Sequence, residues 1–189
     1  MGINLEGLKA LDAGVVEKVL EAAELLKMLE VPNGKVRGFE VVDDGYMQHK
    51  EVHTKLPYKG SEKAAAFDFF SKEDVELKVG EQYTFVTDIK AYMLEDEVLS
   101  IYPRSGHGTK HRLMLANTTG IIDMDYYYNE KTGGNIAITL YNNGKEDYFI
   151  QQGERIAQAI FSKKLDADEN TYTGGDKKRV GGHGSSGKF

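Results

Sequence analysis

Between residues 36 and 161 the sequence is divided into short runs of apolar and β-branched residues, and this division constrains the fold more than any other feature. Polar or glycine-containing turns separate the runs, and Ile136, Ile138 and Leu140 alternate with other residues so that they share one face. No helical pattern alternates with the runs, so a parallel sheet is not expected. The sequence predicts a mainly β, antiparallel sandwich or barrel. The expected strands are residues 36–42, 52–56, 75–79, 83–89, 98–102, 136–141 and 155–161.

The two ends of the chain have different patterns. Residues 8–29 carry apolar side chains every three or four positions, which predicts an amphipathic helix that ends before Pro32. From about residue 166, Asp, Glu, Lys, Thr and Gly dominate, and such a composition buries too little apolar surface to order itself. We therefore expect an N-terminal extension over 1–57, a β domain over 58–165 and a flexible C-terminal arm over 166–189.

Composition and charge argue against several classes of protein. A net charge of -6 disfavours general binding to nucleic acid, and no apolar run is long enough for a transmembrane helix. The first residues lack the basic region and apolar core of a signal peptide. The chain has no cysteine, which excludes disulfides and thiolate metal sites and is compatible with a reducing cytoplasm, where we expect the protein.

The stretch from Leu113 to Tyr126 has the pattern of a β-hairpin. An apolar run leads into the turn Asn117 to Gly120, where Asn and Gly tolerate positive φ, and two isoleucines then favour an extended, buried segment. Asp123 follows directly, three positions before Tyr126. Such a hairpin suits a small ligand with a flat ring, because it offers backbone polar groups, a carboxylate and an aromatic ring. A solvated Asp beside a packed Tyr is the alternative interpretation.

Three further stretches carry groups that bind phosphate. Arg104 and Ser105 follow one expected strand, and Arg155 opens the last one. The tail contains Arg179 and the glycine- and serine-rich run 182–188, which lacks the Ser or Thr and the following helix of a Walker A loop. Backbone N–H groups, hydroxyls and guanidinium groups all bind phosphate oxygens. Each stretch alone is equally typical of a surface arginine or a flexible tail.

Five blocks nevertheless occur in one order, and their combination is highly specific. The blocks are Ala65–Asp68, Pro103–Gly106, Asn117–Tyr126, Gly153–Gln158 and Gly181–Gly187. This order resembles the five-motif pattern of the homotrimeric dUTPase (dUTP diphosphatase) family over about residues 58–189. The chain looks like a phage-like member of that family with an N-terminal extension.

The resemblance implies a jelly-roll-like β domain that forms a homotrimer, with active sites shared between subunits. The reaction would be hydrolysis of dUTP to dUMP and pyrophosphate with Mg²⁺, which limits uracil incorporation into DNA and supplies dUMP for dTMP synthesis. Asp123 would be the catalytic residue, activating the water that attacks the α-phosphate. Asp68 would act on Mg²⁺ through water, because phosphate oxygens would supply most of the direct ligands.

The resemblance also implies which residues contact the substrate. Tyr126 would lie under the deoxyribose, and Asn117, Gly120 and Ile122 in the hairpin would contact the uracil. The remaining residues implied to bind the substrate are Arg104, Ser105, Gly106, Arg155, Gln158, Arg179, His183, Gly184, Ser185 and Ser186.

Some positions depart from the family pattern. His183 stands where the family usually has a Phe that stacks on uracil, and Ala66 stands where Gly is usual. His107 replaces an apolar residue, and the connection from Tyr127 to Asn135 is longer than usual. His107 and His111 have no third ligand nearby in the sequence, so we expect surface or hydrogen-bonding roles rather than a metal site.

Two other functions remain open at this point. A dCTP deaminase of the same fold would need a Glu general base in the hairpin region, which this sequence lacks. A phage regulatory protein with secondary catalysis would use the N-terminal helix and residues 127–135 as contact surfaces.

Overall fold

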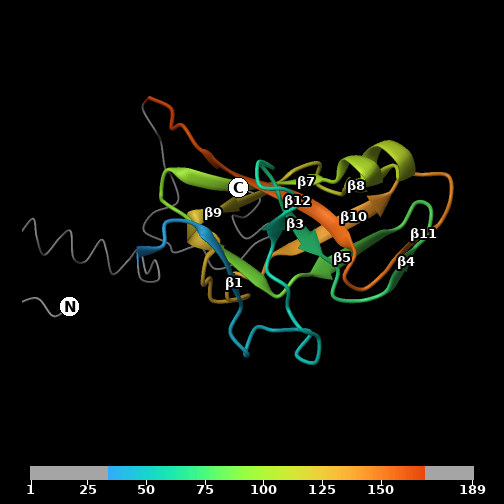
Figure 1. The fold of residues 1–189 in the computed structure, drawn as a ribbon, viewed down its shortest axis with the longest axis horizontal. Coiled ribbons are helices and arrows are strands. Elements are labelled where there is room, and N and C mark those ends of the chain that lie inside the picture. The colour runs from blue at the N-terminus through green and yellow to red at the C-terminus, as the bar shows by residue number, and fades with distance from the viewer. Residues whose placement is uncertain (1–33, 169–189) are drawn as a thin grey trace, which may run out of the picture. The chain divides into compact units, whose positions relative to one another are not determined.

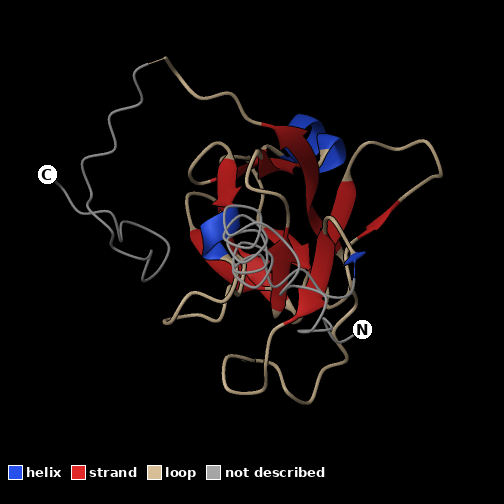
Figure 2. Cartoon of the chain, turned by 90° about the vertical axis from the view of Figure 1, so that its left-hand side faces the viewer, coloured by secondary structure: helices blue, strands red, loops and turns tan. Residues whose placement is uncertain are grey.

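The computed structural model describes residues 34–168 of the 189-residue chain. Regular structure in this part is almost entirely β-strand, and helical residues are confined to short turns (Figure 2). The strands are β1 (Gly38–Val41), β2 (Tyr58–Lys59), β3 (Phe67–Phe70), β4 (Val75–Leu77), β5 (Gln82–Val86), β6 (Ile89–Tyr92), β7 (Glu97–Pro103), β8 (Leu113–Leu115), β9 (Gly120–Asp123), β10 (Ala137–Asn142), β11 (Tyr148–Ile150) and β12 (Arg155–Lys163). A turn of π-helix, η2 (His107–His111), and a turn of 3₁₀-helix, η3 (Met124–Tyr126), complete them.

Every strand pair in residues 34–168 is antiparallel. The largest sheet has the order β2-β3-β12-β7-β9, and a second sheet has the order β5-β10-β8 (Figure 1). The ribbons β1-β6 and β11-β4 complete the set. The long strand β12 lies between β3 and β7, so it brings the end of the described chain beside two much earlier segments.

One apolar cluster joins the two larger sheets. The five-stranded sheet contributes side chains from β3, β7 and β12, and the three-stranded sheet contributes side chains from β5, β8 and β10. The members from these strands include Phe69, Leu99, Ile101, Ala157, Ala159, Phe85, Leu113, Leu115, Ile138 and Leu140. The predicted alternation is confirmed, because Ile136, Ile138 and Leu140 are each at most 2% exposed. Two antiparallel sheets over one core make the jelly-roll-like sandwich that the sequence predicts.

One expected strand, residues 52–56, is absent from the structure. The backbone carbonyl of Val52 accepts a hydrogen bond from the Lys72 ammonium at 2.7 Å, and Val52 N donates to the His49 carbonyl in a turn. The β-branched pattern was misleading here because these backbone groups bond to a side chain and a turn instead of a neighbouring strand.

A second expected strand, residues 83–89, is divided into β5 and β6. Asp88 interrupts it with a left-handed backbone, φ 57°, which is uncommon for a residue with a side chain. The Asp88 carboxylate is fully buried and accepts hydrogen bonds from Gln48 N, His49 N and the Asn135 amide. Burial raises the pKa of Asp88, but these hydrogen bonds outweigh it and hold the pKa below its ordinary value.

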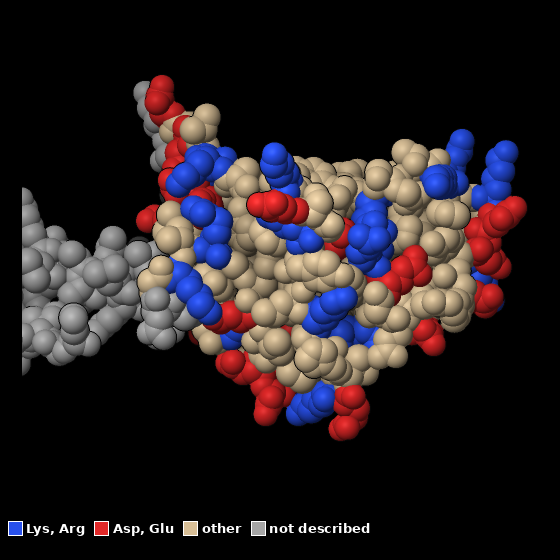
Figure 3. Space-filling model, in the orientation of Figure 1, with Lys and Arg blue, Asp and Glu red and all other residues tan. Residues whose placement is uncertain are grey.

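Acidic and basic side chains are interspersed over the face shown in Figure 3. That face therefore offers no broad positive surface of the kind that follows a nucleic acid backbone. Among residues 34–168 no helix has the length and apolar character needed to cross a membrane. The predicted helix over residues 8–29 lies outside the described part, as does the arm beyond residue 168.

Candidate active site

The predicted hairpin forms one wall of a ring-sized cavity. Strands β8 and β9 both lie beside strands of the main sheets: β8 pairs with β10, and β9 pairs with β7. A cavity of about 160 Å³ lies between them. It is lined by Ile101, Leu115, Asn117, Gly120, Ile121, Ile122, Tyr126, Ala137, Ile138 and Thr139, and we call it the hairpin pocket. An apolar cavity of about 150 Å³ accommodates benzene, so this pocket has room for one ring rather than a whole nucleotide.

Four predicted ligand contacts line the hairpin pocket: Asn117, Gly120, Ile122 and Tyr126. Asp123 directly follows Ile122 as the last residue of β9, and its side chain is half-buried. The structure thus places the predicted catalytic carboxylate one residue from the wall of the pocket.

The structure corrects the predicted β-hairpin in three respects. Strands β8 and β9 do not pair with each other: β8 belongs to the three-stranded sheet and β9 to the five-stranded sheet, so residues 116–119 form a turn between the two sheets. The residue with positive φ is Thr118, at 65°, and not Asn117 or Gly120. Gly120 is required for a different reason: a Cβ atom there would lie 3.1 Å from Cβ of Ile101 on the paired strand β7. Ile121 was expected to be buried but is 54% exposed, because its neighbour Ile122 takes the inward face.

Tyr126 is held in place by the long connection 127–135. Its hydroxyl donates to the Asn135 carbonyl at 2.8 Å and accepts from Thr132 Oγ1 at 3.2 Å. The Asn129 amide donates to the Tyr126 carbonyl at 2.9 Å. The ring is only 6% exposed. The connection therefore fixes the aromatic wall of the hairpin pocket through neutral hydrogen bonds.

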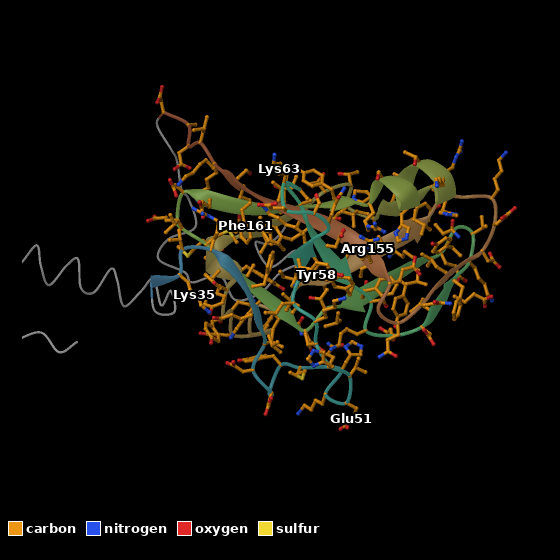
Figure 4. The ribbon with its side chains drawn as sticks, viewed as in Figure 1. Lys35, Glu51, Tyr58, Lys63, Arg155 and Phe161 are labelled. Atoms are coloured by element: carbon orange, nitrogen blue, oxygen red, sulfur yellow. The ribbon has the colours of Figure 1, made fainter. Side chains whose placement is uncertain are left out.

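A second group of predicted residues meets where β3, β7 and β12 lie side by side. Arg104 Nε is 3.3 Å from Asp68 Oδ1, and Arg155 Nη1 is 3.2 Å from Asp68 Oδ2. Gln158 is paired with Asp68 across β12 and β3, and its amide donates to the Pro103 carbonyl at 3.0 Å. Figure 4 labels Arg155 on β12 and Tyr58 on β2, the two strands that flank β3. We call Asp68, Arg104, Arg155 and Gln158 the arginine cluster.

The arginine cluster carries positive charge that remains partly accessible. The side chains of Arg104 and Arg155 are 26% and 44% exposed, whereas that of Asp68 is 11% exposed. One carboxylate therefore meets two guanidinium groups, each of which has further N–H donors. Ser105 and Gly106 follow Arg104 and lead into η2, where Thr109 Oγ1 donates to the Ser105 carbonyl.

The structure does not bring Asp123 and the arginine cluster together within one chain. Asp123 is paired with Val98 near the start of β7, whereas Arg104 directly follows the end of that strand. Six residues of extended strand span about 20 Å, which exceeds the reach of an arginine side chain. A single phosphate cannot contact both groups of the same chain.

The remaining predicted substrate contacts lie outside the described residues: Arg179, His183, Gly184, Ser185 and Ser186. Within residues 34–168 no group of three or more His, Asp or Glu side chains is arranged to hold a metal ion. His107 and His111 accordingly form no metal site with a third such residue there. A cation at this site would depend on ligands from a bound molecule and water.

Comparisons with known proteins identify the family of this chain. The family model described as dUTPase matches residues 53–187. Similar proteins include the deoxyuridine 5'-triphosphate nucleotidohydrolase of Lactococcus lactis, 37% identical over 81% of this chain and 99% of the relative. The mouse protein of the same name is 36% identical over 72% of this chain and 80% of the relative.

Solved structures extend the likeness to three dimensions. The dUTPase of Streptococcus mutans has a TM-score of 0.60 and 33% identity, and the match covers 69% of this chain and 98% of that one. The dUTPase of Staphylococcus aureus phage phi11 has a TM-score of 0.57, covering 74% of this chain and 97% of that one, and at 19% identity it supports the fold alone. From its matched family model, its relatives and its fold, the chain belongs to the dUTPase family.

Proposed function

We propose that this protein hydrolyses dUTP to dUMP and pyrophosphate, limiting uracil incorporation into DNA and supplying dUMP for dTMP synthesis. The observation that carries this proposal is the hairpin pocket, a ring-sized cavity lined by Asn117, Gly120, Ile122 and Tyr126, with Asp123 next in the chain after Ile122. The names of the relatives, deoxyuridine 5'-triphosphate nucleotidohydrolases, identify the substrate class.

In this proposal the pocket selects the nucleoside. Asn117 and the backbone at Gly120 hydrogen-bond the edge of uracil, while Ile122 packs against the base. The buried Tyr126 ring lies under the deoxyribose and leaves no room for a ribose 2'-hydroxyl. The rigid mounting of that ring supports the role, because a clash discriminates only when the clashing group cannot move aside.

Asp123 acts as the general base. Its carboxylate takes a proton from a water molecule, whose oxygen forms a bond to the α-phosphorus while the bond from that phosphorus to the bridging oxygen of the β-phosphate breaks. Pyrophosphate leaves with the electron pair of that bond, and dUMP remains in the hairpin pocket.

The arginine cluster holds the phosphate chain. Arg104 and Arg155 supply forked N–H donors, and Ser105, Gly106 and Gln158 add neutral donors. Arg179, Gly184, Ser185 and Ser186 in the C-terminal arm would cover the β- and γ-phosphates and exclude water. His183 would lie over the base in the position of the usual Phe.

Mg²⁺ fits this site as a partner of the substrate. Asp68 is the one carboxylate in the arginine cluster, and both of its oxygens are 3.2–3.3 Å from guanidinium nitrogens. Each oxygen of an ionised carboxylate has a further lone pair, so Asp68 could also accept a hydrogen bond from water around a cation. The direct ligands of that cation would be phosphate oxygens, and it would neutralise charge on the leaving pyrophosphate.

The active form is a homotrimer in which each site uses groups from more than one subunit. The separation of about 20 Å along β7 supports this, because the hairpin pocket of one chain must be completed by the arginine cluster of another. We place the enzyme in the cytoplasm, because a chain without cysteine is compatible with a reducing compartment.

The test is a pyrophosphate-release assay with dUTP, dCTP, dTTP and UTP at equal concentration. Rapid release from dUTP alone is the expected result. Ammonia release from dCTP would instead identify a deaminase of the same fold, and the absence of turnover on all four nucleotides would contradict the proposal.

A further inference from the structure

The structure contains a buried hydrogen-bond network beside the arginine cluster that the proposed chemistry does not use. His107 in η2 is 4% exposed, and its Nε2 lies 3.0 Å from Glu154 Oε1. The Tyr148 hydroxyl donates to the same oxygen at 3.0 Å, and Gln151 N donates to the other oxygen at 3.1 Å. Glu154 is thus a half-buried carboxylate with three donors, one from η2 and two from the segment directly before it.

The bonding around Glu154 indicates that it is ionised at neutral pH. Burial raises the pKa of Glu154, but the hydrogen bonds from Gln151, His107 and Tyr148 together hold that pKa below its ordinary value. An ionised carboxylate only accepts hydrogen bonds, so His107 must donate its Nε2–H to it. His107 Nδ1 is buried and has no hydrogen-bond partner within residues 34–168, so the ring is oriented by its bond to Glu154 and by its edge-on packing against Tyr148.

Each end of the His107–Glu154 bond leads directly to one arginine of the cluster. On one side, Gly108 N donates to the Arg104 carbonyl at 2.9 Å, so the backbone of Arg104 belongs to the same turn as His107. On the other side, Glu154 immediately precedes Arg155, and its carbonyl accepts from Ser71 N at 2.8 Å at the end of β3. The bond therefore ties together the segments that carry Arg104, Arg155 and Asp68.

We propose that His107 is a positioning residue that sets the spacing of Arg104 and Arg155 through Glu154. This inference rests on the proposed function of the arginine cluster. In the free enzyme Asp68 also holds the two side chains, at 3.3 and 3.2 Å, but a polyphosphate that draws the guanidinium groups away weakens that hold. The His107–Glu154 bond remains, because it connects backbone segments behind the cluster rather than the guanidinium groups themselves.

The expected signature is a change in phosphate affinity and not in the chemical step. In His107→Ala we expect KM for dUTP to rise about tenfold, kcat to stay within about twofold, and inhibition by pyrophosphate to weaken about tenfold, because the lost interaction acts equally on bound substrate and transition state. His107→Gln keeps an N–H donor of similar reach, and we expect it to restore most of the affinity.

His111→Ala is the matched control. His111 lies in the same turn and its ring centroid is 4.6 Å from that of Tyr148, but it is exposed and makes no hydrogen bond to Glu154. KM in this variant should equal that of the wild type.

Three outcomes decide the inference. A raised KM in His107→Ala with recovery in His107→Gln supports it. An unchanged KM in a folded His107→Ala protein overturns it, and so does a loss of kcat without a change in KM.

Should His107→Ala fail to fold, Glu154→Gln serves instead, because it keeps the shape of the side chain but weakens the hydrogen bond from His107. An unchanged KM in Glu154→Gln also overturns the inference. A wild-type protein without dUTP turnover contradicts the proposed function itself, which separates the two failures.

Discussion

The hairpin pocket and the arginine cluster are built by different physical means. The hairpin pocket is mostly apolar, and its Tyr126 wall is fixed by neutral hydrogen bonds to the connection 127–135. The arginine cluster is charged and partly exposed, and its internal contacts are ion pairs with Asp68. A flat, neutral base is recognised by shape, which requires rigid walls, whereas a phosphate chain is held by charge, which tolerates side chains that change partners. If the two regions work by these different means, substitutions in each should change kcat, KM and stability in different ways.

Asp123→Asn removes the proposed general base, which must act on a substrate that both regions hold. We expect kcat for dUTP to fall by at least about a hundredfold while KM changes little, because the amide keeps the shape of the side chain but cannot accept a proton. Steady-state pyrophosphate release measures both parameters. Asp125→Asn, two residues further on, is the control, and near-normal turnover in Asp123→Asn would exclude this carboxylate as the base.

Asp88→Asn tests the support behind the hairpin pocket. The Asp88 carboxylate accepts a hydrogen bond from the Asn135 side-chain amide, and the Asn135 carbonyl holds Tyr126, so Asp88→Asn should lower the free energy of unfolding by about 2 kcal/mol at pH 7. Because the folded-state pKa of Asp88 lies below its ordinary 3.8, the contribution of the carboxylate is full above pH 3.8 and is lost as pH falls through the folded value.

Denaturant unfolding at pH 7 and pH 3 measures the difference between wild type and Asp88→Asn. The difference should be smaller at pH 3. If the two proteins differed more in free energy of unfolding at pH 3 than at pH 7, the ionised form of Asp88 would not be the form that stabilises the fold.

Arg155→Lys tests whether the arginine cluster acts through geometry as well as charge. Lysine keeps the charge but presents no planar fork, so KM for dUTP should rise about tenfold, with a steeper dependence on salt. Arg37→Lys is a matched control, because Arg37 makes a forked pair with Glu97 on β7 away from the cluster. An equal KM in both variants would mean that charge alone suffices.

Tyr126→Phe tests whether the hairpin pocket depends on the hydrogen bonds that hold its aromatic wall. Removing the hydroxyl leaves the Asn135 carbonyl without its donor, so the free energy of unfolding should fall by about 1 kcal/mol. Because the hydroxyl bonds hold the ring in place, discrimination between dUTP and UTP should weaken about threefold, although the ring itself remains. Tyr46→Phe removes a longer, exposed bond to the Glu130 carbonyl at 3.3 Å and should change stability less. Unchanged sugar discrimination in Tyr126→Phe would show that packing alone holds the ring and that the hydroxyl bonds are not needed for it.

Much of this molecule could be predicted from the sequence, for reasons that differ by region. The alternation of Ile136, Ile138 and Leu140 predicted β10 correctly, because period-two burial is a local property. The turn after Leu115 and the extended segment before Asp123 were predicted, but the pairing of the two strands was wrong, because they lie in different sheets. The positive φ lies at Thr118, and Gly120 is needed for its close approach to β7. That approach is a tertiary contact and leaves no local signal.

The parts that could not be predicted depend on long-range partners. Residues 52–56 have a strand-like composition, but Lys72, some twenty residues later, takes the carbonyl of Val52. The sequence around Glu154 does not indicate its hydrogen bonds, because His107 and Tyr148 come within reach of its carboxylate only in the folded chain. The roles of Arg104 and Gln158 remain predictions, although the structure brings both into one cluster with Asp68.

Asp68 also has a consequence for product release. In the free enzyme its carboxylate already supplies the negative counter-charge for Arg104 and Arg155, so an incoming anion must displace an internal competitor. A triphosphate carries enough charge to win this exchange, but a monophosphate or a single inorganic anion gains much less. The same carboxylate that neutralises the empty enzyme would thus shorten the residence of dUMP and reduce occupancy by the orthophosphate of the cell.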